Sequence, residues 1–234
     1  FEYIYFARPD SIIDGKCAYE YRKDFGIQLA KECGIKADIV VPVPDSGVPA
    51  ALGYANYSKI KFELGLIRNH YVGRTFIEPT QSIRSLGVKL KLSATKSIVQ
   101  DKSIILIDDS LVRGTTCHKI VKMLYEAGAK EVHVRIACPE IRFPDFYGVD
   151  MPTKEELLAH KKTNDEMCKY INAKSLKFLS LEGLYEGLKK EKRNNTYPQF
   201  SDHYFTGDYP VKPSDNLGEL NVKQLSLLSS KSNN

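Results

Sequence analysis

The segment Lys102–Asp108, KSIILID, constrains the fold more strongly than any other stretch of the chain. Its four consecutive apolar residues, Ile104 to Ile107, do not alternate with polar ones. Because strands covered on both faces have continuous apolar runs, this segment predicts a buried strand of a parallel sheet. The run ends in two adjacent acids, Asp108 and Asp109, which raises the question of what two carboxylates do at the end of a buried strand.

Helical and strand-like patterns alternate around this segment. The alternation predicts βαβ units, that is, an α/β domain with a mainly parallel sheet flanked by helices. Thr153 and Thr163 each precede a glutamate by three residues, which predicts a capping box at the start of two helices. We expect helices at residues 18–34, 48–58, 115–129, 153–160, 163–173 and 181–190, and strands within 38–47 and at 61–67, 102–108, 131–138 and 175–180.

Composition limits the class of protein. We expect one domain over residues 1–193 and a C-terminal extension over 194–234, whose polar, Ser- and Asn-rich end is expected to be disordered. A net charge of +5 permits phosphorylated small molecules, but no dense Lys/Arg tract indicates nucleic acid. Five cysteines without pairing-like spacing favour reduced thiols and a cytoplasmic setting. No apolar run reaches the ~18–20 residues of a membrane span.

Asp108 and Asp109 stand where ligands bind in open α/β sheets, beyond the carboxyl end of a strand. The residues after them, SLVRGTT, lead into a helix, so backbone N–H groups and the positive helix end can hold a phosphate. Two carboxylates repel a phosphate. Sugar hydroxyls or Mg²⁺ should therefore lie between the acid pair and the phosphate. The pattern predicts a ribose phosphate site with Mg²⁺. Hydroxyl donors and a glycine for close backbone approach complete it: Ser110, Gly114, Thr115 and Thr116.

A plainer alternative is that Asp109 or Ser110 only caps the helix. An acid followed by serine is common at strand ends, so these two residues alone do not distinguish a helix cap from a phosphate site. The buried run before them, with the glycine and two threonines after them, favours the phosphate site. The stretch is not a Walker A loop, which needs the pattern G-x-x-x-x-G-K-[ST].

The stretch ILIDDSLVRGTT closely resembles the phosphoribosyl pyrophosphate (PRPP) motif of type I phosphoribosyltransferases, and more narrowly that of the amidophosphoribosyltransferase family. The resemblance implies the type I phosphoribosyltransferase fold. It also implies a pentosyltransferase that moves ammonia, taken from glutamine, to C1 of PRPP. The products are 5-phosphoribosylamine and pyrophosphate, in the first committed step of de novo purine biosynthesis. Other stretches agree over most of residues 1–210: FEYIYFARPDS, VPVPDSG, YVGRTFIEPTQ, GVKLKL, FYGVD, SLEGL and FTGDYP.

The stretch VPVPDSG, residues 41–47, resembles the family's pyrophosphate loop. On its residues alone an ordinary Pro/Asp/Ser/Gly turn is the competing interpretation. The resemblance implies that Ser46 binds Mg²⁺ together with Asp108 and Asp109. It also implies PRPP binding by a larger set: Asp45, Ser46, Gly47, Lys91, Asp108, Asp109, Ser110, Arg113, Gly114, Thr115 and Thr116.

Residues 69–97 have weak periodicity, which is typical of a functional or disordered loop. A basic loop can close over PRPP, exclude water and neutralise pyrophosphate, while a solvated basic loop is the alternative. The basic residues in and beside it are Arg68, Arg74, Arg84, Lys89 and Lys91. The resemblance implies that the loop orders on PRPP binding and helps to form an ammonia channel. The matching residues are Tyr71, Arg74, Thr75, Phe76 and Ile77, and the expected catalytic ones are Tyr71, Arg74 and Thr75.

No general base is evident, and neutral ammonia needs none. We expect His118, just inside the phosphate helix, to be structural or solvent-facing. The family's complete enzyme has an N-terminal glutaminase domain led by a nucleophilic cysteine, and nothing in this sequence matches that domain. The chain as given is therefore expected to use free ammonia only. The family is commonly oligomeric and inhibited by purine nucleotides, so a homo-oligomer with purine nucleotide inhibitors is expected.

Some family members hold an iron–sulfur cluster with four cysteines. Three matching positions carry Asp145, Ser201 and Tyr204 here, so we predict no cluster. Two other functions stay open. A salvage enzyme of the same fold would join PRPP to a nucleobase, and the PRPP motif alone does not separate it. A PRPP-sensing regulator would keep the fold without catalysis and would usually add a nucleic-acid-binding face, which the sequence does not indicate.

Overall fold

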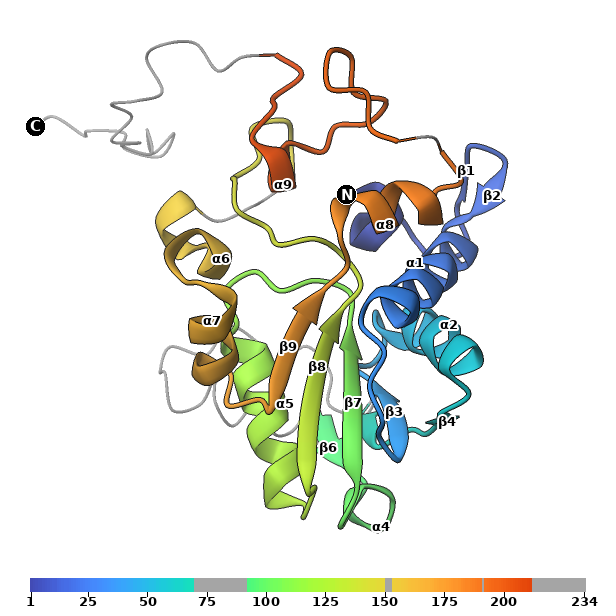
Figure 1. Ribbon diagram of the computed structural model, residues 1–234, viewed down its shortest axis with the longest axis vertical. Coiled ribbons are helices and arrows are strands. Elements are labelled where there is room, and N and C mark those ends of the chain that lie inside the picture. Colours follow the sequence, from blue (N-terminus) through green and yellow to red (C-terminus); the bar gives the residue numbers. More distant parts are fainter. Residues whose placement is uncertain (70–91, 150–152, 191, 212–234) are drawn as a thin grey trace, which may run out of the picture.

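The computed structural model describes residues 1–69, 92–149, 153–190 and 192–211 (Figure 1). Five parallel strands form its core: β3 (Ile39–Pro42), β4 (Lys61–Phe62), β7 (Ser103–Asp108), β8 (Glu131–Ile136) and β9 (Ser175–Phe178). They lie in the order β4-β3-β7-β8-β9. This arrangement confirms the predicted α/β class with a mainly parallel sheet.

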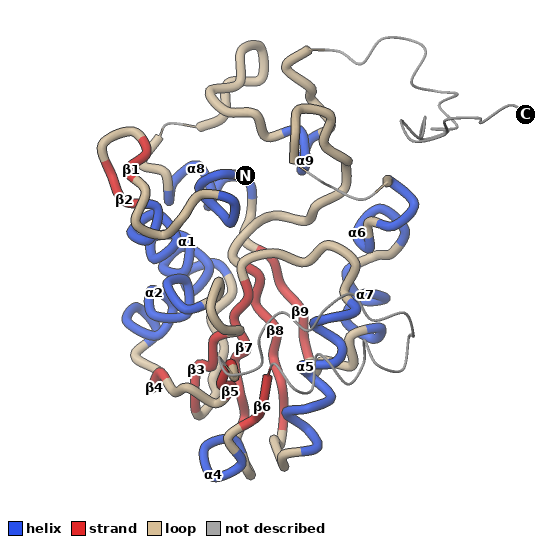
Figure 2. Tube along the Cα trace, turned by 180° about the vertical axis from the view of Figure 1, so that it is seen from behind, coloured by secondary structure: helices blue, strands red, loops and turns tan. Residues whose placement is uncertain are grey.

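The described helices are α1 (Ala18–Glu32), α2 (Val48–Ser58), α4 (Lys96–Val99), α5 (Thr115–Glu126), α6 (Leu158–Lys161), α7 (Asn164–Tyr170), α8 (Leu181–Gly187) and α9 (His203–Thr206). In Figures 1 and 2, α1 and α2 lie together on one side of the sheet, and α5 and α7 lie on the other. No described helix is long and apolar enough to cross a membrane.

Smaller elements complete the described chain. They are the π-helical turn η1 (Glu2–Phe6), the hairpin of β1 (Ile12–Ile13) and β2 (Lys16–Cys17), the antiparallel pair β5 (Leu66–Arg68) and β6 (Leu92–Ala94), and the 3₁₀ turn η2 (Lys154–Glu156). The turn η1 leads the chain across the carboxyl edge of the sheet, between α1 and α8 (Figure 1).

Strand β7 is the centre of the core. The side chains of Ile104 to Ile107 are fully buried, as the apolar run predicts. Pro42 of β3 pairs with Ile107, and Asp108 pairs with Ile136 of β8. Because the strands are parallel, their carboxyl ends lie at one edge. The segments that follow β3 and β7 therefore begin side by side.

The prediction of one strand at residues 61–67 is wrong. The structure divides this segment into β4, which joins the main sheet, and β5, which leaves it to pair with β6. Leu66 is almost fully buried where β5 pairs with Ala94. An apolar segment can be buried by either sheet, so the local pattern did not mark the point where the chain changes partner.

The predicted helix at residues 153–160 is also different. The structure has the turn η2 followed by α6, and Thr153 makes no capping hydrogen bond. Leu157 and Leu158 are both buried, and the Leu158 N–H donates to the carbonyl of Val112 at 2.9 Å. This long-range contact bends the segment. The capping box at Thr163 is confirmed, with Glu166 as its partner.

Candidate functional site

The loop that follows β3 lies directly against the end of β7. The Val43 N–H donates to the carbonyl of Ile107 at 2.8 Å, and the Gly47 N–H donates to the carbonyl of Val43 at 2.9 Å. Gly47 comes so close that a Cβ there would lie 2.5 Å from the Ile107 carbonyl oxygen. The next residue after Ile107 is Asp108, so this loop and the acid pair are neighbours, as the two motifs require.

The acid pair has few hydrogen-bond partners among the described residues. Asp109 is buried, and Asp108 is half-buried. Asp108 accepts the N–H of Asp109 at 3.0 Å, and Asp109 accepts the hydroxyl of Ser110 at 3.0 Å. Burial, and then the adjacent charge of Asp109, raise the pKa of Asp108 well above its ordinary value. Two carboxyls with so few donors can receive hydroxyl donors or a cation from a ligand.

The donor set fits Mg²⁺ that is shared with a substrate. Mg²⁺ is usually held by one or two carboxylates together with substrate phosphates. Asp108 and Asp109 supply the carboxylates, and the 43–47 loop brings the Ser46 hydroxyl to the same edge. Among the described residues no group of three or more His, Cys, Asp or Glu could hold a metal ion. The acid pair therefore suits an ion that needs ligand oxygens to complete its coordination.

The turn after the acids ends at the start of α5. Its N-cap is Gly114, and no side chain caps the helix. The alternative in which Asp109 or Ser110 caps this helix is therefore wrong. Thr115 and Thr116 are the first two helical residues, and both are exposed. The free N–H groups and two hydroxyls at this helix start are available to an anion.

The segment 157–170 supports this turn from behind. Gly114 has a φ of +76°, and a Cβ there would lie 2.6 Å from Leu158 Cδ2 and 3.1 Å from Tyr170 Cε1. His118 Nδ1 donates to the carbonyl of Tyr170 at 2.8 Å, which supports its expected structural role. Nothing in the local sequence pointed to this support, because its contacts come from residues far along the chain.

Arg113 has a protein partner. Its Nε donates to Glu156 Oε1 at 3.1 Å, and both side chains are about half exposed. An ion pair this exposed contributes only ~0–1 kcal/mol. A phosphate group can therefore draw Arg113 away from Glu156 at little cost.

An open cavity of about 370 Å³ lies beside the 43–47 loop. Asp45 accepts a hydrogen bond from Arg68 at 2.7 Å at its rim, and the Pro44–Asp45 peptide bond is cis. Sequence reasoning found Asp45, Ser46 and Arg68 but missed the other wall, which comes from the start of the chain and from α1. The lining residues are Tyr5, Ala7, Pro9, Arg22, Pro44, Asp45, Ser46, Pro49 and Arg68.

Several predicted residues lie outside the described part of the chain. They are Tyr71, Arg74, Thr75, Phe76, Ile77, Arg84, Lys89 and Lys91. Their expected roles in the basic loop, in catalysis and in PRPP binding stay predictions.

The positions matched to cluster cysteines do not offer a metal site. Asp145 accepts the N–H groups of Tyr147 and Val149 at 2.9 and 2.8 Å, and it accepts His203 Nε2 at 2.8 Å. The side chain of Tyr204 also donates to it. Ser201 is exposed. With its carboxylate fully used and no thiolate at these three positions, Asp145 does not fit a cluster ligand.

Comparison with known proteins agrees with a site for a ribose phosphate. Residues 23–172 match the family model of the phosphoribosyl transferase domain. An amidophosphoribosyltransferase of Rhizobium etli is 59% identical over 231 residues, which cover 98% of this chain and 47% of that protein. Amidophosphoribosyltransferase 1, chloroplastic, of Arabidopsis thaliana is 52% identical over 215 residues, which cover 92% of this chain and 37% of that protein.

A solved structure is also similar. The glutamine PRPP amidotransferase from B. subtilis, complexed with ADP and GMP, matches with a TM-score of 0.83 and 49% identity. The match covers 92% of this chain and 47% of that chain. This likeness confirms the type I phosphoribosyltransferase fold. The chain spans about half or less of the length of the relatives it matches.

Proposed function

The chain belongs to the phosphoribosyl transferase domain family, and on that premise we propose that it is the synthase part of an amidophosphoribosyltransferase. Its reaction moves ammonia to C1 of PRPP and yields 5-phosphoribosylamine and pyrophosphate. In the complete protein the ammonia comes from glutamine. The observation that carries this proposal is the meeting of the 43–47 loop, the acid pair and the start of α5 at one sheet edge. Relatives named for this reaction at 52–59% identity support it.

The three parts of the site divide the substrate between them. Asp108 and Asp109 accept the ribose hydroxyls, because acceptors with few protein donors suit vicinal hydroxyl groups. The 5′-phosphate lies at the start of α5, where Thr115 and Thr116 add hydroxyl donors to the helix N–H groups. The remaining phosphate contacts come from Ser110, Arg113, Gly114 and Lys91, and pyrophosphate lies against Asp45, Ser46 and Gly47.

Mg²⁺ would be held by Asp108, Asp109 and Ser46. When bound, it neutralises the acid pair and the pyrophosphate. The chain itself keeps these groups in place before the substrate arrives, since the Val43 N–H ties the loop to the Ile107 carbonyl at the end of β7 and the Gly47 N–H closes the loop on the Val43 carbonyl. Such preorganisation lowers the barrier to a step in which charge moves onto a leaving group.

The chemistry is a displacement at C1 of the ribose. The bond from C1 to the pyrophosphate oxygen breaks, and its electron pair leaves with pyrophosphate. The lone pair of ammonia forms the new C1–N bond, and the extra proton passes to solvent. No side-chain base is required, because neutral ammonia is already nucleophilic. The chain contributes positioning and charge stabilisation, in which the resemblance gives Tyr71, Arg74 and Thr75 a part.

Regulation and assembly follow from the same proposal. The B. subtilis relative was solved with ADP and GMP, which supports purine nucleotides as inhibitors of this protein. A glutaminase part would supply ammonia, and we propose a cytoplasmic homo-oligomer. The salvage and regulator alternatives are less favoured, since the similar proteins at about half identity carry the amidotransferase name.

Asp108→Asn and Asp109→Asn test the proposal in the full-length protein. Pyrophosphate release from PRPP and Mg²⁺ is measured with saturating ammonia. Each variant should lose on the order of 100-fold in rate, because hydroxyl and metal contacts are made most strongly in the transition state. Asp165→Asn, at an exposed acid of α7, is the matched control and should keep the wild-type rate.

The outcomes separate the alternatives. Unchanged rates in both site variants would show that the acid pair is not the reaction site. Pyrophosphate release that depends on a nucleobase instead of ammonia would indicate a salvage enzyme. Tight, salt-dependent nucleic-acid binding without pyrophosphate release would indicate a regulator.

A further inference from the structure

Arg22 of α1 is a buried cation that the motifs do not mention. Its side chain is among the few buried charged ones, with a residue exposure of 5%. Its Nε donates to the carbonyl of Tyr3 at 3.1 Å, and its Nη2 donates to Ala7 at 2.7 Å and more weakly to Glu2 at 3.4 Å. Three backbone carbonyls of one short turn therefore converge on a single guanidinium.

The charge of Arg22 has no carboxylate partner within 4 Å in the described ranges. Burial lowers its pKa from the ordinary value, and the charge of Asp109 is the largest opposing influence. A buried arginine is costly unless it is well hydrogen-bonded. Within the described part of the chain, the hydrogen bonds of the Arg22 guanidinium go to carbonyls of the first seven residues, so the position of that turn and the burial of Arg22 depend on each other.

The same turn forms a wall of the cavity beside the 43–47 loop. Tyr5, Ala7 and Pro9 line the cavity together with Asp45 and Ser46 of the loop. Tyr5, which lines the cavity, is about half exposed. Arg22 lines the same space.

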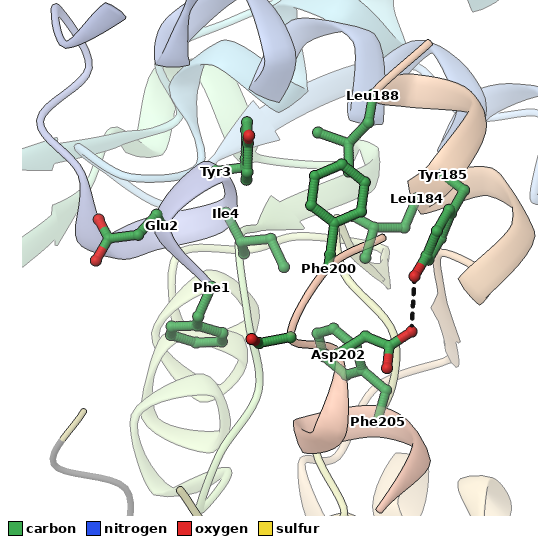
Figure 3. Close-up of a pocket in the computed structure, with 11 residues that line it drawn as sticks. Phe1, Glu2, Tyr3, Ile4, Leu184, Tyr185, Leu188, Phe200, Asp202 and Phe205 are labelled. Atoms are coloured by element: carbon green, nitrogen blue, oxygen red, sulfur yellow. Dashed lines mark hydrogen bonds between the residues drawn. The ribbon is translucent and has the colours of Figure 1, made fainter. Parts of the chain in front are cut away.

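Aromatic packing supports the turn from its other side. In Figure 3, Tyr3 and Ile4 face Phe200 and Leu188 across a small apolar pocket of about 200 Å³. The rings of Tyr3 and Phe200 pack edge to face, with 5.6 Å between their centroids. The turn is therefore held from behind by apolar contacts, while hydrogen bonds from Arg22 fix its backbone toward the cavity.

We propose that Arg22 is a positioning residue that holds the N-terminal turn as the wall of the pyrophosphate cavity and so limits attack by water on PRPP. The inference rests on the proposed function. Water and ammonia are similar in size, and either can attack C1 as pyrophosphate leaves. Attack by water forms a C1–O bond and gives ribose 5-phosphate, with a proton lost to solvent. A loosened wall admits more water, so the balance between the two nucleophiles depends on this turn.

The test compares two rates in the full-length protein with PRPP and Mg²⁺. Pyrophosphate release without ammonia or glutamine measures hydrolysis, and release with saturating ammonia measures amination. In Arg22→Gln the ratio of hydrolysis to amination should rise about 10-fold, because small misplacements near the reacting centre have large rate effects. Arg22→Lys keeps the charge but loses the planar fork, so its ratio should rise about 3-fold.

Arg142→Gln is the matched control, since the side chain of this exposed arginine pairs with Glu140 alone among the residues that the structure describes. Its ratio should equal that of the wild type. A merely structural role for Arg22 would reduce the amount of folded protein and lower both rates together, leaving the ratio unchanged. An unchanged ratio in the Arg22 variants overturns the inference.

Two further results keep the test decisive. If Arg22→Gln does not fold, Arg22→Lys and Tyr5→Ala decide, because Tyr5 is a half-exposed wall residue that folding does not require. A wild-type ratio in both of those variants also overturns the inference. If the wild type itself releases no pyrophosphate with ammonia, the proposed function fails instead, and the two failures are distinguishable.

Discussion

The Asp108–Asp109 pair and Asp145 lie at the same end of this molecule, but they differ in how many hydrogen-bond donors the protein gives them. Asp108 and Asp109 are adjacent, with two short-range donors between them. Asp145 stands alone and accepts from two backbone N–H groups, His203 and Tyr204. Counting donors from the described residues, the oxygens of Asp108 and Asp109 can accept further hydrogen bonds, while those of Asp145 are fully used.

The electrostatic consequences differ in sign. Burial and the charge of Asp109 raise the pKa of Asp108. At Asp145 burial alone would raise the pKa, but the N–H groups of Val149 and Tyr147 and the side chains of Tyr204 and His203 hold it below its ordinary value. A carboxylate with its full set of donors stabilises the fold, whereas an under-supplied pair is available to a ligand.

The largest expected effect is on stability at Asp145. Asp145→Ala leaves four donors without their acceptor, two of them on the buried residues His203 and Tyr204, so the free energy of unfolding should fall by about 3–5 kcal/mol. Urea titration of the purified protein measures this. Asp165→Ala, at an exposed acid, should stay within about 0.5 kcal/mol of the wild type.

Asp108→Asn provides the contrast within the same experiment. Because folding disfavours the ionised form of Asp108, a neutral amide should leave the free energy of unfolding unchanged or raise it by up to about 1 kcal/mol. A loss as large as that of Asp145→Ala would show that the two carboxyl sites do not differ in the way described.

The next largest effect is expected at Gly114, in the turn at residues 110–116 that we call the phosphate turn. Gly114→Ala combines a left-handed backbone with contacts to Leu158 and Tyr170, so we expect about 2 kcal/mol lower stability and about 10-fold higher KM for PRPP. Gly15→Ala is a closely matched control, since its φ is +77° but nothing lies within 4 Å of an added Cβ. Equal effects in both variants would mean that backbone strain alone matters and that the segment behind the turn does not.

The pH dependence of stability should separate the two carboxyl regions. Burial lowers the pKa of His203 from 6.5, so the unfolded chain binds the extra proton first as pH falls. Stability contributed by neutral His203 is present above pH 6.5 and declines below it, by at most ~1.4 kcal/mol per pH unit. Asp108 has the opposite sign, since its raised pKa makes stability decline as pH rises above 3.8.

Thermal unfolding from pH 5 to 8 checks these signs. His203→Gln should show a flatter profile between pH 5 and 7 than the wild type. Asp108→Asn should make the rise in stability with pH steeper, because it removes the opposing contribution. A His203→Gln profile that coincides with the wild type would contradict the first assignment.

The smallest stability effect is expected at Arg113. Arg113→Gln breaks an exposed ion pair with Glu156, so the free energy of unfolding should change by less than about 0.5 kcal/mol. The KM for PRPP should still rise several-fold, because we propose that the guanidinium contacts a phosphate of bound PRPP. Glu156→Gln, which frees Arg113, should not raise that KM. An unchanged KM in Arg113→Gln would remove Arg113 from the binding site.

Much of the fold was predictable because its signals are local. The helix expected at residues 48–58 has those bounds in α2, and the run Ile104 to Ile107 is the buried centre of β7. The glycine, hydroxyl residues and acids of the phosphate turn were also found, since each residue type has a role in its own stretch of chain.

Other features were not predictable because their causes lie far along the chain. The break between β4 and β5 depends on which sheet buries Leu66. The bend at Leu158 depends on the carbonyl of Val112. Arg22 looks like one charged residue of an amphipathic helix until the chain start is folded over it.

The sequence by itself determined that a buried parallel strand delivers two acids and a turn of small and hydroxyl residues to one sheet edge, because apolar continuity and turn chemistry act over a few residues. Only the tertiary structure decided how those acids differ from Asp145, and which residues stand behind them. Donor supply, burial and the partners of a buried charge are set by segments that meet in space. Local patterns specify which polar groups each segment carries, and packing decides which of those groups are satisfied by the protein and which are available to a ligand.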